Sequence, residues 1–204
     1  MTPATKGLLA IGVLALAGIA YVSYTGARAP GASHAALQTA AASDGKPVNA
    51  CALLTQAEVA ATVGAEVAAG ERRDDGEVGG MGDFATPGTY SSTCFWRFVD
   101  TREENPDLPM GGHRFVILNA MVWPKDTDAH KFLQSFHDAF KEDLIPSDPV
   151  MLENLGDEAL WWGDGTAVRK NAKSFGVSVF LQNGDKPTQK KMEEALARKV
   201  AGRL

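Results

Sequence analysis

HRFVILNAMVW, residues 113–123, is the segment from which the architecture of this chain can best be read. Successive side chains of a β-strand point to opposite faces of a sheet, and apolar residues occupy both alternating sets here. A strand that is apolar on both faces is typical of the middle of a sheet. The earlier segment TCFWRFV, residues 93–99, predicts an antiparallel partner joined to it by a long hairpin loop. One alternating set is Phe115, Ile117, Asn119, Met121 and Trp123, and the other is Arg114, Val116, Leu118, Ala120 and Val122.

Three helices are predicted around this strand pair. Thr55 and Glu58 have the spacing of a capping box, so a short helix should run from Gln56 to Val63 and end at Gly64. Two longer helices are indicated by apolar residues at helical spacing. One is expected at residues 128–143, capped by Asp126 or Thr127, with Ala129, Leu133, Phe136 and Phe140 on its buried face; the other begins at residues 186–188, with Met192, Ala195, Leu196, Lys199 and Val200 on its buried face.

Further strands are expected at residues 66–69, 159–162, 166–170 and 175–182. The elements therefore alternate as helix, strands, helix, strands and helix, with turns between the strands. This order predicts an α+β domain over residues 50–204. We expect an antiparallel sheet of about five to six strands, helices packed mainly on one face, and one disulfide.

The first 24 residues predict export. Residues 8–24 (LLAIGVLALAGIAYVSY) carry no charge and reach the short end of the length that spans a bilayer. A transmembrane anchor is the first interpretation, and a cleaved signal segment is the alternative. Residues 25–49, rich in Ala, Gly, Ser and Thr, predict a flexible linker. Both interpretations place the domain in the cell envelope, on the periplasmic or extracytoplasmic side, with the membrane as one partner.

The charge of the chain argues against nucleic acid as a partner. Lys6 and Arg28 are the only charges in the first 34 residues, which leaves 18 basic and 25 acidic residues in the rest. Binding to nucleic acid or to anionic lipid needs clustered Lys and Arg. The remaining partner class is a protein of the envelope.

The chain has two cysteines, Cys51 and Cys94. In an exported protein such a pair most simply forms a disulfide. Lipidation at Cys51 is disfavoured because this residue lies far beyond the apolar segment. A catalytic thiol is the third option, although neither cysteine has a histidine close by in the sequence.

Residues 70–92 contain six glycines and predict a long exposed loop or a lid over a ligand. No phosphate-binding glycine motif is present in it. Asp83 in this loop, His113, and the adjacent Asp157 and Glu158 are isolated candidates for acid–base chemistry, and the last two should point to opposite faces of a strand. No catalytic residue, metal site or cofactor is predicted. His130 and His137 are seven residues apart, a spacing that does not suit a zinc site without a third ligand. Both are therefore expected at the surface.

Trp123, Trp161 and Trp162 are the candidates for a contact surface, because amphipathic aromatic side chains anchor interfaces. Each is also a plausible core residue. A stable variant that loses function would distinguish the two roles.

Three segments together resemble a known class of domain: NACALLTQAEV at residues 49–59, CFW at residues 94–96 and GDEALW at residues 156–161. The chain is similar to actinobacterial cell-envelope lipoproteins of unknown function, whose domains open with a C-x-L-L-T-x-x-E-V helix and carry a C-x-W strand. The resemblance implies that Cys51 pairs with Cys94 and that Trp96 is a core residue. It supplies no activity. The chain departs from the family pattern because it has no lipobox cysteine near its apolar segment.

The sequence as a whole favours a non-catalytic binding or assembly module of the envelope. The alternative is a small-ligand carrier or sensor with residues 70–92 as its lid. An enzyme is the least favoured class, because no catalytic motif with its supporting residues is present.

Overall fold

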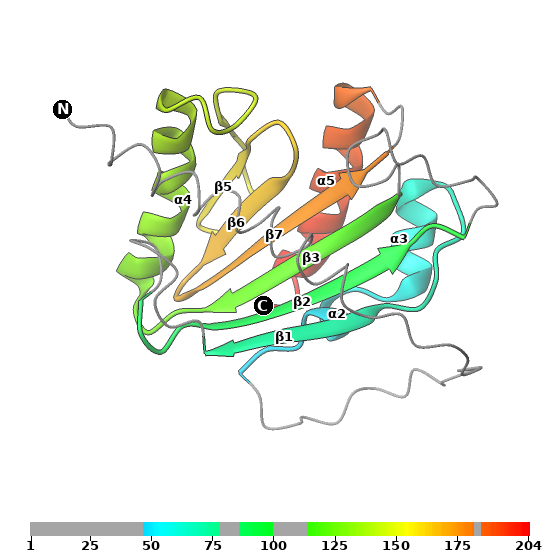
Figure 1. The fold of residues 1–204 in the computed structure, drawn as a ribbon, viewed down its shortest axis with the longest axis horizontal. Helices are drawn as coiled ribbons and strands as arrows, with labels where there is room; N and C mark the ends of the chain where they lie inside the picture. Colours follow the sequence, from blue (N-terminus) through cyan, green and yellow to red (C-terminus); the bar gives the residue numbers. More distant parts are fainter. Residues whose placement is uncertain (1–46, 78–85, 100–113, 182–184) are drawn as a thin grey trace.

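The computed structural model describes residues 47–77, 86–99, 114–181 and 185–204. Within these ranges the chain forms a seven-stranded antiparallel sheet in the order β1-β2-β3-β7-β6-β5-β4, together with four helices (Figure 1). In chain order the elements are α2 Ala50–Leu53, α3 Gln56–Val63, β1 Glu71–Glu77, β2 Tyr90–Arg97, β3 Phe115–Val122, α4 Asp126–Lys141, β4 Val150–Met151, β5 Glu158–Trp161, β6 Thr166–Lys170, β7 Lys173–Phe180 and α5 Lys186–Ala201.

The predicted central strand is β3. It pairs along its full length with β2 on one side and β7 on the other, both antiparallel. Leu118, at the middle of β3, lies opposite Cys94 and Val177 and is fully buried. The predicted antiparallel pairing of residues 93–99 with residues 113–123 is confirmed.

The sheet has seven strands rather than five to six, because two edge strands were not predicted. β1 lies in the first part of residues 70–92, which were predicted to be a loop. The predicted strand at residues 66–69 forms only an isolated bridge, between Val67 and Phe98. β4 has only two residues, too few to show alternation.

The helices divide between the two faces of the sheet. The core cluster that joins α2, α3 and α5 to the sheet contains Cys94, Leu118 and Val177. A second cluster joins α4 to the opposite face, through Leu133 and Phe136 of α4 and Leu160 of β5. Most helices therefore cover one face, as predicted, while α4 covers part of the other. Figure 1 shows α4 at the opposite end of the view from α3.

The helix boundaries follow from their caps. The Thr55–Glu58 capping box is present, and α3 ends at Gly64 in the left-handed conformation, as predicted. α4 begins at Asp126 after Lys125, so neither Asp126 nor Thr127 caps it with its side chain. Asp185 caps α5 by accepting from the Thr188 N–H. The buried stripe of α5 differs from the predicted one and consists of Gln189, Glu193, Leu196, Ala197 and Val200.

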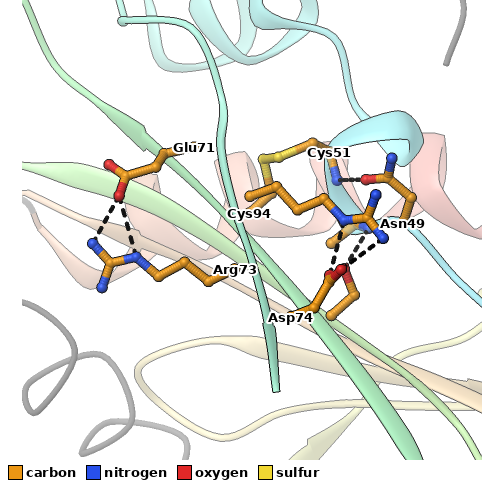
Figure 2. Close-up of a disulfide and its surroundings, with 9 residues drawn as sticks. Asn49, Cys51, Glu71, Arg73, Asp74 and Cys94 are labelled. Carbon is orange, nitrogen blue, oxygen red and sulfur yellow. Dashed lines mark hydrogen bonds and ion pairs between the residues drawn. A yellow bond between two sulfur atoms is a disulfide. The ribbon is translucent and has the colours of Figure 1, made fainter. Parts of the chain in front are cut away.

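The disulfide between Cys51 and Cys94 is confirmed, and it joins α2 to β2 (Figure 2). Asn49 caps α2 by accepting from the Cys51 N–H at 3.1 Å. Cys94 is fully buried beside Trp96, which is itself a core residue. The bond therefore holds the start of the folded domain against an interior strand.

Several predictions concern residues outside the described ranges. These are the anchor or signal at residues 1–24, the linker up to residue 46, the candidates Asp83 and His113, and the middle of the proposed lid, residues 78–85. Within the described ranges, none of the helices has the length and hydropathy of a membrane span.

Candidate functional site

The face of the sheet that carries α4 is only partly covered by it. α4 packs on β5, β6 and the adjoining part of β7. Among the residues that the structure describes, no other helix packs on this face. The remaining area, here called the β2–β3 surface, contains Arg73, Ser91, Thr93, Phe95, Phe115, Ile117, Asn119, Gly176 and Phe180, as the strand register requires.

Three phenylalanines form an aromatic cluster at one end of the β2–β3 surface. The rings of Phe115 and Phe180 are stacked with their centroids 4.4 Å apart, and Phe95 lies 6.3 Å from Phe115. Phe115 is buried, whereas Phe95 and Phe180 are partly exposed. The Arg73 guanidinium lies 5.1 Å from the Phe95 ring centroid. Aromatic groups of this kind supply contact area with little conformational entropy to lose.

A polar group lies next to this cluster. The Asn119 side-chain amide donates to Ser91 Oγ at 2.9 Å and to Thr93 Oγ1 at 2.8 Å. Both hydroxyl groups belong to buried residues, and Thr93 is only 2% exposed. Since Asn119 uses both of its N–H groups in these bonds, its carbonyl oxygen remains as an acceptor.

The centre of the surface has room above it. Gly176 lies opposite Asn119 on β7, and a Cβ atom built on Gly176 would meet nothing within 4 Å. On β6 the neighbouring position is Ala167, a small residue beneath α4. The aromatic cluster and the Asn119 amide therefore lie near Gly176, where the described residues leave open space for a further group.

The rim of the surface is charged but internally paired. Glu71 accepts from Arg73 at 2.8 Å and from Arg97 at 3.0 Å. The hydrogen bond from Arg73 lowers the pKa of Glu71 below its usual value, with Arg97 contributing in the same direction. The pairing orients Arg73 across Phe95.

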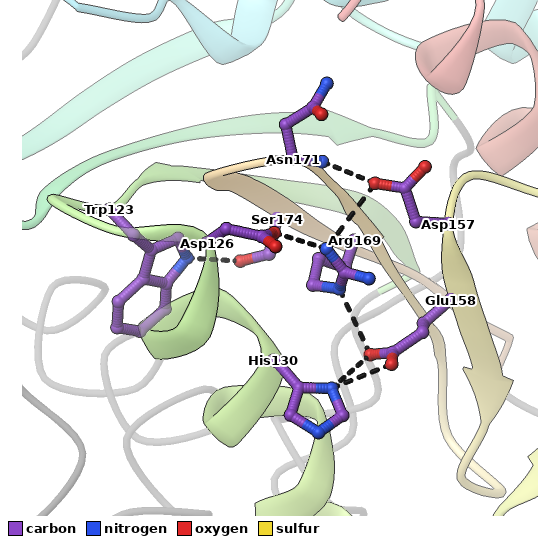
Figure 3. Close-up of polar contacts among 8 residues, drawn as sticks. All are labelled: Trp123, Asp126, His130, Asp157, Glu158, Arg169, Asn171 and Ser174. Atoms are coloured by element: carbon purple, nitrogen blue, oxygen red, sulfur yellow. Dashed lines mark hydrogen bonds and ion pairs between the residues drawn. The ribbon is translucent and has the colours of Figure 1, made fainter.

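On the other side of the surface, an ionic network around Arg169 fixes the start of α4 (Figure 3). Arg169 donates to Asp126 of α4, to Glu158 at 3.1 Å and to Asp157 at 3.4 Å. His130 of α4 lies 2.7 Å from the same Glu158 carboxylate. Asp157 and Glu158 were predicted to point to opposite faces, but both reach Arg169, because Asp157 precedes the first residue of β5. Their contacts indicate a structural role.

The three candidate tryptophans all have partners inside the domain. Trp123 is 4% exposed and donates from its indole nitrogen to Ser174 at 2.8 Å. Trp161 donates to Glu193 at 2.8 Å. The Trp162 ring lies 5.9 Å from that of Phe136 on α4. Their predicted role in an interface stays a prediction.

Comparison with known proteins adds no family: no family model, no curated protein and no solved structure matches this chain. The resemblance to actinobacterial envelope lipoproteins therefore stays a prediction. The function has to be argued from the residues themselves.

Glu193 is the residue that the sequence reasoning missed. It is fully buried and accepts three hydrogen bonds, which is unusual for a glutamate. A signal was present, because Gln189 and Glu193 occur four residues apart in line with Leu196 and Val200.

Elsewhere, the described residues contain no group of three His, Cys, Asp or Glu side chains able to hold a metal ion.

Proposed function

We propose that this chain is an exported, membrane-tethered envelope protein whose domain is a non-catalytic binding or assembly module. Its contact surface is the β2–β3 surface. The observation that supports this most directly is the combination of a partly exposed aromatic cluster, the Asn119 amide and the unfilled space above Gly176. Aromatic anchors beside a few fixed polar groups are typical of recognition sites.

The polar chemistry of this surface suits binding better than catalysis. A serine or threonine nucleophile needs a general base within hydrogen-bond reach. Ser91 and Thr93 both contact the Asn119 amide, which cannot take up a proton at neutral pH. The Asn119 carbonyl oxygen, held in place by these two bonds, can orient a partner by accepting a hydrogen bond.

A small-ligand carrier is the second candidate function. The open space at Gly176 favours it, because a small ligand could occupy that space beside Asn119. In this case Asn119 would orient one polar group of the ligand while the phenylalanines contact its apolar part.

A photo-crosslinking experiment separates these functions. A benzophenone amino acid replaces Phe95 in one full-length variant and Gln134, an exposed residue of α4, in a matched control. After irradiation of intact cells, a protein adduct at position 95 and not at 134 supports the assembly module. A low-mass adduct at position 95 supports the carrier. Equal labelling of the two positions contradicts both functions.

The membrane tether is tested separately. If residues 8–24 are an uncleaved anchor, fractionation leaves the intact chain in the membrane pellet. Extraction should then require detergent, because salt and alkaline washing do not remove a transmembrane helix. A soluble mature form beginning between residues 27 and 36 would show that the segment is a cleaved signal instead.

A further inference from the structure

Glu193 of α5 lies at a junction of three elements. Its Oε2 accepts from the Trp161 indole nitrogen of β5 at 2.8 Å. Its Oε1 accepts from the Val179 backbone N–H of β7 at 3.0 Å and from the Gln189 side chain, one turn earlier on α5, at 2.9 Å. The carboxyl group therefore connects the C-terminal helix to two strands of the sheet.

The bond from Val179 has a topological cause. β6 begins at Thr166, which lies opposite Val177, so β7 continues past β6 without a strand partner on that side. The Val179 N–H would otherwise be left without an acceptor in the core, which is unfavourable for a buried polar group. Glu193 provides the acceptor that the missing strand would have supplied.

The surroundings of Glu193 balance two opposing effects. Burial raises the pKa of its carboxyl to about 7, and this exceeds the lowering by the donors Gln189, Val179 and Trp161 and by the Lys186 charge. Lys186 is paired with Asp164, and Lys190 lies 5.4 Å from the Trp161 ring centroid. Neither lysine forms an ion pair with Glu193 itself.

We infer that Glu193 is a proton-controlled connection between α5 and the β5–β7 part of the sheet. With its proton bound, the carboxyl is neutral in the core and α5 stays docked. When the proton is lost, an ionised group remains in the core without an ion-pair partner, and the opening of α5 that returns it to water becomes more favourable. The docking of α5 thus responds to the pH of the compartment that the domain faces.

The direction in which pH changes the stability of the fold follows from the difference between the folded and unfolded pKa values of Glu193. The pKa of Glu193 is higher in the folded chain than the ordinary value of 4.5. Its contribution to stability is therefore fully present below pH 4.5 and is lost as the pH rises through about 7. Asp164, Lys186 and Lys190 are the other charged groups that face this site.

The test uses the full-length chain in detergent micelles and follows the Trp161 indole and Val179 amide resonances by NMR from pH 5 to pH 9. We expect both resonances to titrate with one shared midpoint near neutral pH. Glu193→Gln should abolish this transition. Glu194→Gln, which removes the neighbouring carboxyl that pairs with Lys190, should leave it unchanged. Two flat resonances in the parent chain, or an unchanged transition in Glu193→Gln, would overturn the inference.

A second variant keeps the test informative if Glu193→Gln folds poorly. Trp161→Phe removes one donor to the ionised carboxylate and keeps the aromatic packing. The midpoint of the Val179 amide should then rise by about one pH unit, because a hydrogen bond to the charged form stabilises that form. An unchanged or lowered midpoint would show that the Trp161–Glu193 bond does not control the protonation of this group.

Discussion

At the scale of single residues, the same substitution should have opposite effects on stability at two buried threonines, Thr166 of β6 and Thr93 of β2. Thr166 is fully buried, and its hydroxyl has no hydrogen-bond partner among the residues that the structure describes. Thr166→Val keeps the β-branched shape and removes the unpaired group. It should raise the free energy of unfolding by about 1 kcal/mol, measured by urea unfolding.

Thr93→Val is the matched control for that variant. Thr93 Oγ1 accepts from Asn119, so the same substitution leaves an amide N–H without its acceptor. The free energy of unfolding should fall by about 1 kcal/mol. Equal effects of the two variants would mean that the hydroxyl contacts do not determine the outcome.

The ion pair between Arg203 and Glu58 should make the free energy of unfolding depend on pH in the acidic range. Arg203 pairs with both carboxylate oxygens of Glu58, at 2.8 and 2.6 Å, and this lowers the pKa of Glu58 to about 2. Because the folded pKa is below the ordinary value of 4.5, the stabilisation is present above pH 4.5 and is lost as the pH falls through about 2. Arg203→Met should reduce stability at pH 7 by about 1 kcal/mol.

The measurement for this pair is urea unfolding of the parent and Arg203→Met chains at pH 7 and at pH 1.5. The difference between them should become smaller at the lower pH, where Glu58 is protonated in both. A difference that stays the same would show that the hydrogen bond from Arg203 to the Leu53 carbonyl, rather than the ion pair, gives the stabilisation.

At the scale of elements, β1 depends on one glycine. The register between β1 and β2 shifts between Asp74 and Gly76, and Gly76 has a φ of +67°. Gly76→Ala would meet no neighbouring atom, so its cost comes from the backbone alone and should be about 1 kcal/mol. Gly176→Ala, which also meets no neighbouring atom but has no positive φ, should be neutral or slightly stabilising. Thermal unfolding of both variants provides the comparison.

Some helices and strands could be predicted from the sequence, and others could not. β3 and β7 were predicted because their apolar alternation is a local property, and α3 because its capping box lies within four residues. β1 could not be recognised in this way, since ERRDDGE is polar on both faces and becomes a strand only by pairing with β2. The apolar stripe of α4 indicates which side of the helix is buried, but not which face of the sheet it covers.

The candidate site was less predictable than the fold. Phe95, Phe115 and Phe180 come from three strands, and only the register places them side by side. A shift of one residue would turn any of them to the other face. Glu193 was passed over because a glutamate in an amphipathic helix is ordinarily a solvent-exposed residue.

At the scale of the whole molecule, the disulfide stabilises the domain by constraining the unfolded chain. It closes a loop of 43 residues between Cys51 and Cys94. In the chain-entropy model this bond contributes about 4 kcal/mol. Cys51→Ala with Cys94→Ala should lower the free energy of unfolding by about that amount, measured by urea unfolding of the oxidised parent and the double variant.

Reduction of the parent chain is the control for the double variant. It should give the same loss of stability, because both treatments release the same loop. Two free thiols in protein isolated under non-reducing conditions would contradict the bond itself.

The position of this bond also determines how the domain would carry a mechanical load. If the predicted linker ties the chain to the membrane, tension enters the domain at Pro47, a few residues before Cys51. The disulfide passes that tension directly to β2, which is hydrogen-bonded on both sides by β1 and β3. A force along β2 would load many of these hydrogen bonds at once, whereas α2 alone is a single helical turn of four residues. Under that prediction, the disulfide would connect the tether to an interior strand of the sheet.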